Sequence, residues 1–170
     1  RLVFQDIADT AKSGVNAKGL KYNTALMLKT DGSLVGDYQK MKRIPFGEYV
    51  PLVSDIRALR RWVENFFGKF LNEIAAGNSH QQFNDERFSI IPLICYEVMF
   101  PEFVANAVTH ANSREPNAEH ELQKSSLLVG LSSNGWFGDT HQPYQHVNAS
   151  ILRAVENRMP LVHAVNNGPS

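Results

Sequence analysis

The second half of the chain alternates short apolar runs with stretches that suit helices. The apolar runs are Phe88 to Cys95, Leu127 to Leu131 and Pro160 to Val165, and each has the length of a buried strand. Between them, a helix is predicted from Pro101, a residue that suits a first helical turn, to Ala111, and a second from Gln142 to Asn157. Strands that alternate with helices in this way indicate an α/β fold, in which helices pack on the face of a sheet.

In the first half, two strand-like runs surround an Asp-Gly pair. Tyr22 to Lys29 and Leu34 to Lys40 flank Asp31-Gly32, and both turn residues tolerate positive φ, so a β-hairpin is predicted. An amphipathic helix is predicted from Ser54 to Ala76, because apolar residues recur there at i, i+3, i+4 spacing. The remaining stretches are expected to be loops or, at the start, the tail of a helix: 1–19, 77–86 and 112–124.

Composition limits the classes of function. The 170 residues fit one ordinary domain or a large part of one, and 17 basic residues balance 17 acidic ones, which argues against a general nucleic-acid binder. The single cysteine, Cys95, excludes an internal disulfide and a multi-cysteine zinc site, and His141 and His146 are spaced too irregularly to favour another metal site. No apolar run reaches the length of a membrane span. Because the first residue is Arg1, we expect a piece of a longer protein.

Cys95 is the first candidate for chemistry. It ends an apolar strand and precedes a helix start, so its side chain is expected at the edge of the sheet, where a helix N-terminus favours the reactive thiolate. The alternative is a buried structural cysteine, because free cysteine is among the most buried residue types.

A second candidate is the polar segment that follows the predicted hairpin. Lys40 stands at a strand end, where an ammonium group can stabilise a thiolate or an oxyanion, and Glu48 is either a buried polar anchor or an acid–base group. The alternative is a solvated basic edge followed by a proline-rich turn.

A third candidate follows the second buried strand. Small polar residues there precede two aromatic ones, Trp136 and Phe137, which indicates a pocket wall. The alternative is a loop that tucks both aromatic side chains into the core, and the two interpretations are compatible.

Taken together, these residues resemble the carbon–nitrogen hydrolase (nitrilase) superfamily, and within it the family of bacterial apolipoprotein N-acyltransferases. The resemblance rests on the order and spacing of several motifs: Tyr22-Asn23-Thr24, Tyr38-x-Lys40, Pro-Phe-Gly-Glu-Tyr-Val-Pro at 45–51, Ile94-Cys95-Tyr96-Glu97, Trp136-Phe137-Gly138, Gln145-His146, Arg153-Ala154-x-Glu156 and Asn166-Asn167-Gly168.

The resemblance implies a nitrilase-like α-β-β-α sandwich that is incomplete at both ends of residues 1–170. It also implies a Glu–Lys–Cys triad in which Cys95 is the nucleophile and Lys40 the lysine, with Glu48, Tyr96 and Glu97 at further positions that the family needs. The general-base glutamate of the family lies upstream of this segment, so the segment by itself is expected to be inactive. The family usually has Ser-Asn-Asp where this chain has Ser132-Ser133-Asn134.

The function that the resemblance implies is acyl transfer. A membrane phospholipid would donate an acyl chain to the cysteine, and the resulting thioester would pass it to the N-terminal amine of the diacylglyceryl-cysteine of an apolipoprotein. No cofactor or metal is implied, and the expected location is the periplasmic face of the bacterial inner membrane. The alternatives are a soluble nitrilase-like amidase and an inactive homologue that binds lipid or protein.

The predicted helix from Ser54 to Ala76 follows the proline-rich motif, where the family has loops over the active site. Its apolar side contains aromatic residues, and its arginines and lysine could meet lipid phosphates. The segment is therefore expected to lie on the membrane surface or over a lipid pocket, or else to pack on the domain's own core. The aromatic residues are Trp62, Phe66, Phe67 and Phe70.

Overall fold

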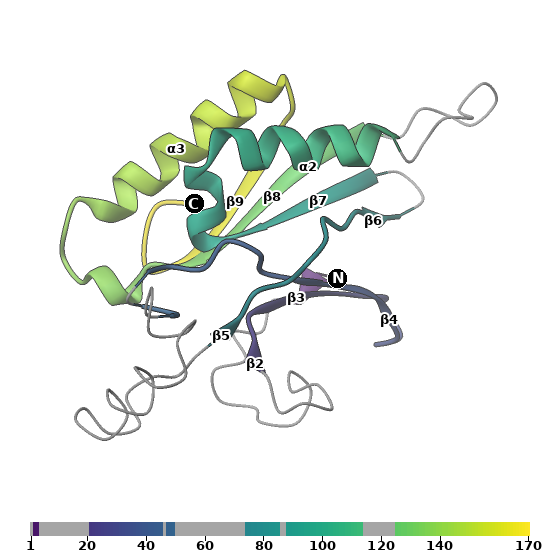
Figure 1. Ribbon diagram of the computed structural model, residues 1–170, viewed down its shortest axis with the longest axis horizontal. Helices are drawn as coiled ribbons and strands as arrows, with labels where there is room; N and C mark the ends of the chain where they lie inside the picture. The colour runs from purple at the N-terminus through teal and green to yellow at the C-terminus, as the bar shows by residue number, and fades with distance from the viewer. Residues whose placement is uncertain (1, 4–20, 46, 50–73, 86–87, 114–124) are drawn as a thin grey trace, which may run out of the picture.

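The computed structural model describes residues 2–3, 21–45, 47–49, 74–85, 88–113 and 125–170 (Figure 1). The described elements are, in chain order, β1 (Leu2–Val3), β2 (Lys21–Tyr22), β3 (Thr24–Leu28), β4 (Leu34–Gln39), β5 (Ile74–Ala75), β6 (Phe83–Asn84), β7 (Phe88–Ile94), the 3-10 helix η1 (Cys95–Met99), α2 (Pro101–Ser113), β8 (Ser125–Ser133), the 3-10 helix η2 (Gly135–Phe137), α3 (Gln142–Asn157) and β9 (Leu161–Asn166). None of the helices in these ranges is long and apolar enough to cross a membrane.

The second half forms the predicted sheet. Its strand order is β6-β7-β8-β9, with β7, β8 and β9 parallel and β6 antiparallel to β7. Parallel neighbours need crossover connections, and α2 and α3 supply them, both on the same face of the sheet (Figure 1). The α/β prediction is thus confirmed, and each apolar run predicted as a strand is one.

The first half contains the predicted hairpin. Strands β3 and β4 pair antiparallel, and β1 adds to the free side of β3. The backbone N–H of Lys29 donates to the carbonyl of Ser33 at 2.9 Å, and Gly32 has a φ of +85°, which explains the need for glycine at that position. The carboxylate of Asp31 accepts bonds from both the amide and the hydroxyl of Ser33.

Two apolar clusters make the layers. Alternate residues of β7 point to opposite faces, so Ile90 and Ile94 pack towards the hairpin sheet, while Ile91 and Leu93 pack towards α2. Because both faces of β7 are covered, its sequence is a nearly unbroken apolar run. The described residues therefore supply one helical layer on the four-stranded sheet and, on the other face of that sheet, the three-stranded hairpin sheet (Figure 1). Strands β2 and β5 form a third, two-stranded sheet.

Four expectations about secondary structure were wrong. The helix predicted up to Ala76 does not extend through Ile74, which belongs to β5 and pairs parallel with β2; residues 50–73 of that prediction lie outside the described residues. The loop predicted for 77–86 contains β6, because Phe83 is buried between the sheets and pairs with β7. The polar stretch from 112 still belongs to α2 as far as Ser113, and Leu2 lies in a strand.

Gly77 is predicted to be intolerant of any side chain. Its amide donates to the carbonyl of Lys40 at 2.8 Å, and a Cβ at this position would lie 2.2 Å from the backbone oxygen of Gln39. Gly77→Ala should therefore lower the free energy of unfolding by about 1–3 kcal/mol, measured by denaturant titration.

The matched control is Gly36→Ala, whose Cβ would meet only the ring of Phe83 at 3.2 Å, a side chain that is able to shift. A Gly77→Ala protein as stable as this control would contradict the close packing of the backbone beside Lys40.

Candidate active site

Cys95 stands at the sharp turn between β7 and η1. Its side chain is partly exposed, and its φ of +50° lies in the left-handed region, which costs a residue with a Cβ about 1–2 kcal/mol. The expected position at the sheet edge is confirmed, and the fully buried cysteine of the alternative is not what the structure has. Because the conformation is unfavourable by itself, contacts around the turn must maintain it.

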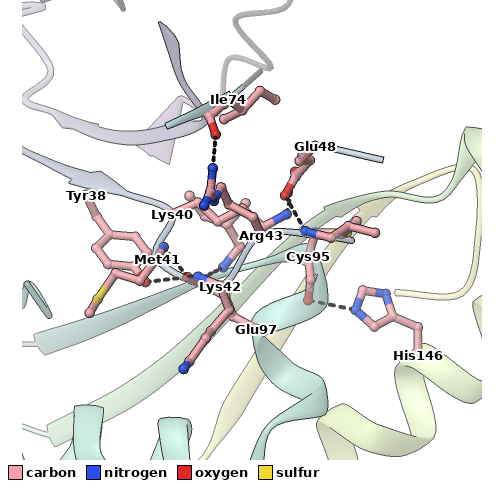
Figure 2. Close-up of polar contacts among 12 residues, drawn as sticks. Tyr38, Lys40, Met41, Lys42, Arg43, Glu48, Ile74, Cys95, Glu97 and His146 are labelled. Carbon is pink, nitrogen blue, oxygen red and sulfur yellow. Dashed lines mark hydrogen bonds and ion pairs between the residues drawn. The ribbon is translucent and has the colours of Figure 1, made fainter. Parts of the chain in front are cut away.

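The carboxylate of Glu97, two residues later, makes several of these contacts. Glu97 is fully buried, and Oε2 accepts the backbone N–H of Ile94 at 2.8 Å. Oε1 accepts the backbone N–H groups of Met41 at 2.6 Å and Lys42 at 3.1 Å, as well as the hydroxyl of Tyr38 at 2.8 Å. One side chain therefore joins the end of the hairpin to the turn that carries the cysteine (Figure 2).

Burial governs the protonation of this pair. It raises the pKa of Glu97 above its usual value, while the four hydrogen bonds to the carboxylate oppose that change. Burial also raises the pKa of Tyr38, and the negative charge of Glu97 adds to the effect. Tyr38 therefore remains a hydroxyl donor at physiological pH.

Lys40 and Glu48 form a second polar contact beside the first. The ammonium group of Lys40 is buried and lies 2.6 Å from Oε1 of Glu48, and Oε2 of Glu48 accepts the backbone N–H of Ile44 at 2.8 Å. The hairpin end is fixed in turn by the N–H of Lys40, which donates to the carbonyl of Asn23 at 2.8 Å. Glu48 is thus an anchor for a buried lysine, and the solvated edge of the alternative interpretation is wrong for Lys40.

Glu97 brings the lysine and the cysteine into one region. Lys40 directly precedes Met41, Cys95 directly follows Ile94, and both of these neighbours donate to Glu97. Figure 2 shows the two side chains in the same part of the molecule. A partly exposed thiol in the same region as a buried ammonium group is an arrangement that supports attack on a carbonyl carbon, because the ammonium can offset the charge of the oxyanion.

His146 completes the surroundings of the cysteine. It lies on α3, is 3% exposed, and its Nε2 donates to the backbone carbonyl of Cys95 at 3.0 Å. The contact with Cys95 was not predicted from the sequence, where the Gln145-His146 motif was the available signal.

The aromatic candidates are placed differently from one another. Tyr96 stacks edge-on with Phe100 at 5.0 Å between ring centroids. Trp136 is 84% exposed, so the alternative interpretation, in which it tucks into the core, is wrong, and Phe137 is partly exposed. Both follow β8, and since Ile94 pairs with Leu131 in parallel strands, η2 leaves the sheet at the same edge as Cys95.

The segment Ser132-Ser133-Asn134, where the chain departs from the family pattern, leads into η2. Asn134 is buried; its side-chain oxygen accepts the hydroxyl of Ser132 at 3.2 Å, and its backbone N–H donates to Asn166 at 2.9 Å. The side-chain nitrogen of Asn134 has no hydrogen-bond partner among the described residues. The difference from the family pattern at Ser133 and Asn134 therefore lies in a turn next to the site.

Two other expectations concern the site. The aromatic residues of the predicted helix, Trp62, Phe66, Phe67 and Phe70, lie outside the described residues. Within the described ranges, no group of three or more His, Cys, Asp or Glu side chains could hold a metal ion.

Comparisons with known proteins show the family and the fold. The family model for carbon–nitrogen hydrolases matches residues 7–170. Apolipoprotein N-acyltransferases from Geobacter metallireducens and Azotobacter vinelandii are each 34% identical, over 88% and 90% of the chain. The chain spans about a quarter of the length of these relatives, 25% and 26%. Among solved structures, an amidase of the nitrilase superfamily from Nesterenkonia has a TM-score of 0.52 at 20% identity, over 88% of this chain and 43% of its own.

The carboxylate of Glu97 is predicted to matter far more for stability than any one of its donors. Glu97→Gln replaces one acceptor oxygen by an NH₂ group that faces other donors, so buried backbone N–H groups lose their partner, and the free energy of unfolding should fall by at least about 2 kcal/mol. Tyr38→Phe removes a single donor and should cost about 1 kcal/mol. Equal effects of the two substitutions in chemical denaturation would contradict the role given to Glu97.

Proposed function

Because the chain belongs to the carbon–nitrogen hydrolase family, we propose that it is the catalytic part of an N-acyltransferase that works through a cysteine thioester. The acyl donor is a membrane phospholipid, and the acceptor is the N-terminal amine of the diacylglyceryl-cysteine of an apolipoprotein. The geometry of the site supports a thioester intermediate. A partly exposed thiol lies on a sharp turn, and the carboxylate of Glu97 connects this turn to the strand end that bears a buried lysine. The choice of substrates is supported by the relatives that are named apolipoprotein N-acyltransferases.

The first half-reaction forms the thioester. Sγ of Cys95 attacks the ester carbonyl of the phospholipid, and Lys40 stabilises the oxyanion while Glu48 holds the lysine in place. The thiol proton passes to a glutamate base, which the family carries upstream of this segment, and from there to the alkoxide of the departing lysophospholipid.

The second half-reaction releases the cysteine. The free amine of the acceptor attacks the thioester carbonyl, the C–S bond breaks, the thiolate of Cys95 is regenerated, and the base removes the proton that the amine loses. Donor and acceptor therefore react in turn, which gives ping-pong kinetics. Tyr96, Glu97, Trp136 and Phe137 are proposed to support or line the substrate site, since Glu97 fixes the turn and the aromatic residues lie at the same sheet edge.

The proposed location is the periplasmic face of the bacterial inner membrane. Both substrates are lipids or carry lipid chains, so the active site must reach the bilayer surface. The proposed contact with the membrane is the segment that contains Trp62, Phe66, Phe67 and Phe70, because its sequence pattern is that of an amphipathic helix.

The test uses the full-length protein in membranes with a phospholipid that carries a tagged acyl chain. We expect a label on the peptide that contains Cys95, sensitive to hydroxylamine as a thioester is, found by mass spectrometry. The label should chase onto an added diacylglyceryl peptide. The Cys95→Ala protein, with its fold verified, is the control and should carry no label.

Other outcomes would favour other functions. A label that water removes as fast as the acceptor amine does would favour a nitrilase-like hydrolase. A folded wild-type protein that takes up no label, and whose cysteine resists alkylation, would favour an inactive binding module and contradict the proposal.

A further inference from the structure

The inner face of α3 is polar. Its buried residues include His146, Ser150 and Arg153, whereas a helix on a sheet usually buries its apolar stripe. Two of these side chains reach the backbone of η1: Nε2 of His146 donates to the carbonyl of Cys95 at 3.0 Å, and Nη1 of Arg153 donates to the carbonyl of Val98 at 3.5 Å. The polar face of α3 is therefore directed at the short helix that begins with the cysteine.

We propose that His146 is a positioning residue for the nucleophile: its Nε2–H group holds the carbonyl of Cys95 and so fixes the turn that presents Sγ. The unfavourable φ of +50° at Cys95 needs contacts that hold it, and Glu97 holds only the amide side of the turn, through Ile94. His146 holds the carbonyl side. The contacts of Glu97 and His146 come from η1 and α3, and they hold the backbone on both sides of Cys95.

The hydrogen bond defines the state of the imidazole ring. A carbonyl oxygen only accepts, so Nε2 carries the proton, and Nδ1 has no partner among the described residues. Burial lowers the pKa of His146 from its usual value, the bond to Cys95 opposes this, and the charge of Lys40 lowers the pKa further. A neutral donor is thus retained beside the ammonium group of Lys40, where a second positive charge would be unfavourable.

A second histidine supports the first. The hydroxyl of Ser150 lies 3.2 Å from the carbonyl of His146, to which it donates, and 3.0 Å from Nδ1 of His163 on β9. Since the serine has one hydrogen, Nδ1 of His163 must be the donor to Ser150. The ring of His163 also packs edge-on against that of His146, with 5.3 Å between centroids. These contacts restrain the ring that holds the cysteine.

The direction of the bond separates positioning from proton transfer. The protonated nitrogen of His146 is engaged with the backbone oxygen of Cys95 and is not available to the thiol. In this tautomer a role as a base would require Nδ1 to accept the proton, and Nδ1 is buried without a hydrogen-bond partner among the described residues. Positioning requires only a neutral donor at the same place, which the amide nitrogen of a glutamine can provide, because it lies as far along the side chain as Nε2.

The experiment compares His146→Gln with His146→Leu in the full-length protein. Two reactions are followed for each variant. One is the acylation of Cys95 by the tagged phospholipid, which gives kcat and KM, and the other is the alkylation of Cys95 by iodoacetamide, which gives a rate. His146→Leu should lower kcat by about 10–100-fold with KM changed little, and should slow alkylation several-fold. His146→Gln should keep both rates within about threefold of the wild type. His141→Leu is the matched control, because His141 is exposed at the start of the same helix and should change neither rate.

Two results would overturn the proposal. One is a folded His146→Leu protein with wild-type rates; the other is a His146→Gln protein as impaired as His146→Leu. Should the leucine variant fail to fold, His146→Asn replaces it, since its amide nitrogen is too short to reach the carbonyl of Cys95. The measurement of acylation rests on the proposed function, whereas the measurement of alkylation does not. If the wild-type protein transfers no acyl chain, the alkylation rates of the variants still test the role of His146.

Discussion

The buried carboxylate of Glu97 is the interaction on which the rest of the site depends. It accepts donors from two distant parts of the chain, the end of the hairpin at Tyr38, Met41 and Lys42 and the end of β7 at Ile94. A carboxylate is costly to bury unless its oxygens are hydrogen-bonded, so the burial of Glu97 favours the association of the two segments. Their association is what places a lysine and a cysteine, far apart in the sequence, in one site.

The sheet contributes the second constraint. Strand β7 is apolar on both faces and therefore fixed between two clusters, and the chain must leave it abruptly at Cys95 to start η1. The reactive residue consequently stands at the boundary between a rigid core and a polar edge. Glu97 and His146 hydrogen-bond to the backbone at that edge, and the buried ammonium group of Lys40, held 2.6 Å from Glu48, lies in the same region.

Local sequence patterns predicted those helices and strands whose formation depends on neighbouring residues in the sequence. The Asp31-Gly32 hairpin and the alternating strands and helices of the second half were correct, because turn chemistry and apolar periodicity act over a few residues. Ile74 was assigned to a helix by periodicity, yet pairs with β2, a long-range contact that no local pattern contains. No local pattern predicts the three bonds of Glu97 to Tyr38, Met41 and Lys42 or the bond of His146 to Cys95, since each joins residues that are 51 to 59 positions apart.

The most direct measurement is native-state hydrogen exchange at the amides of Met41, Lys42 and Ile94, the three backbone donors to Glu97. If one carboxylate holds both segments, the three amides become exposed in the same opening event and share one opening free energy, despite their separation in the sequence. Rapid exchange at Met41 and Lys42 with lasting protection at Ile94 would show that the segments open independently, and would contradict the account.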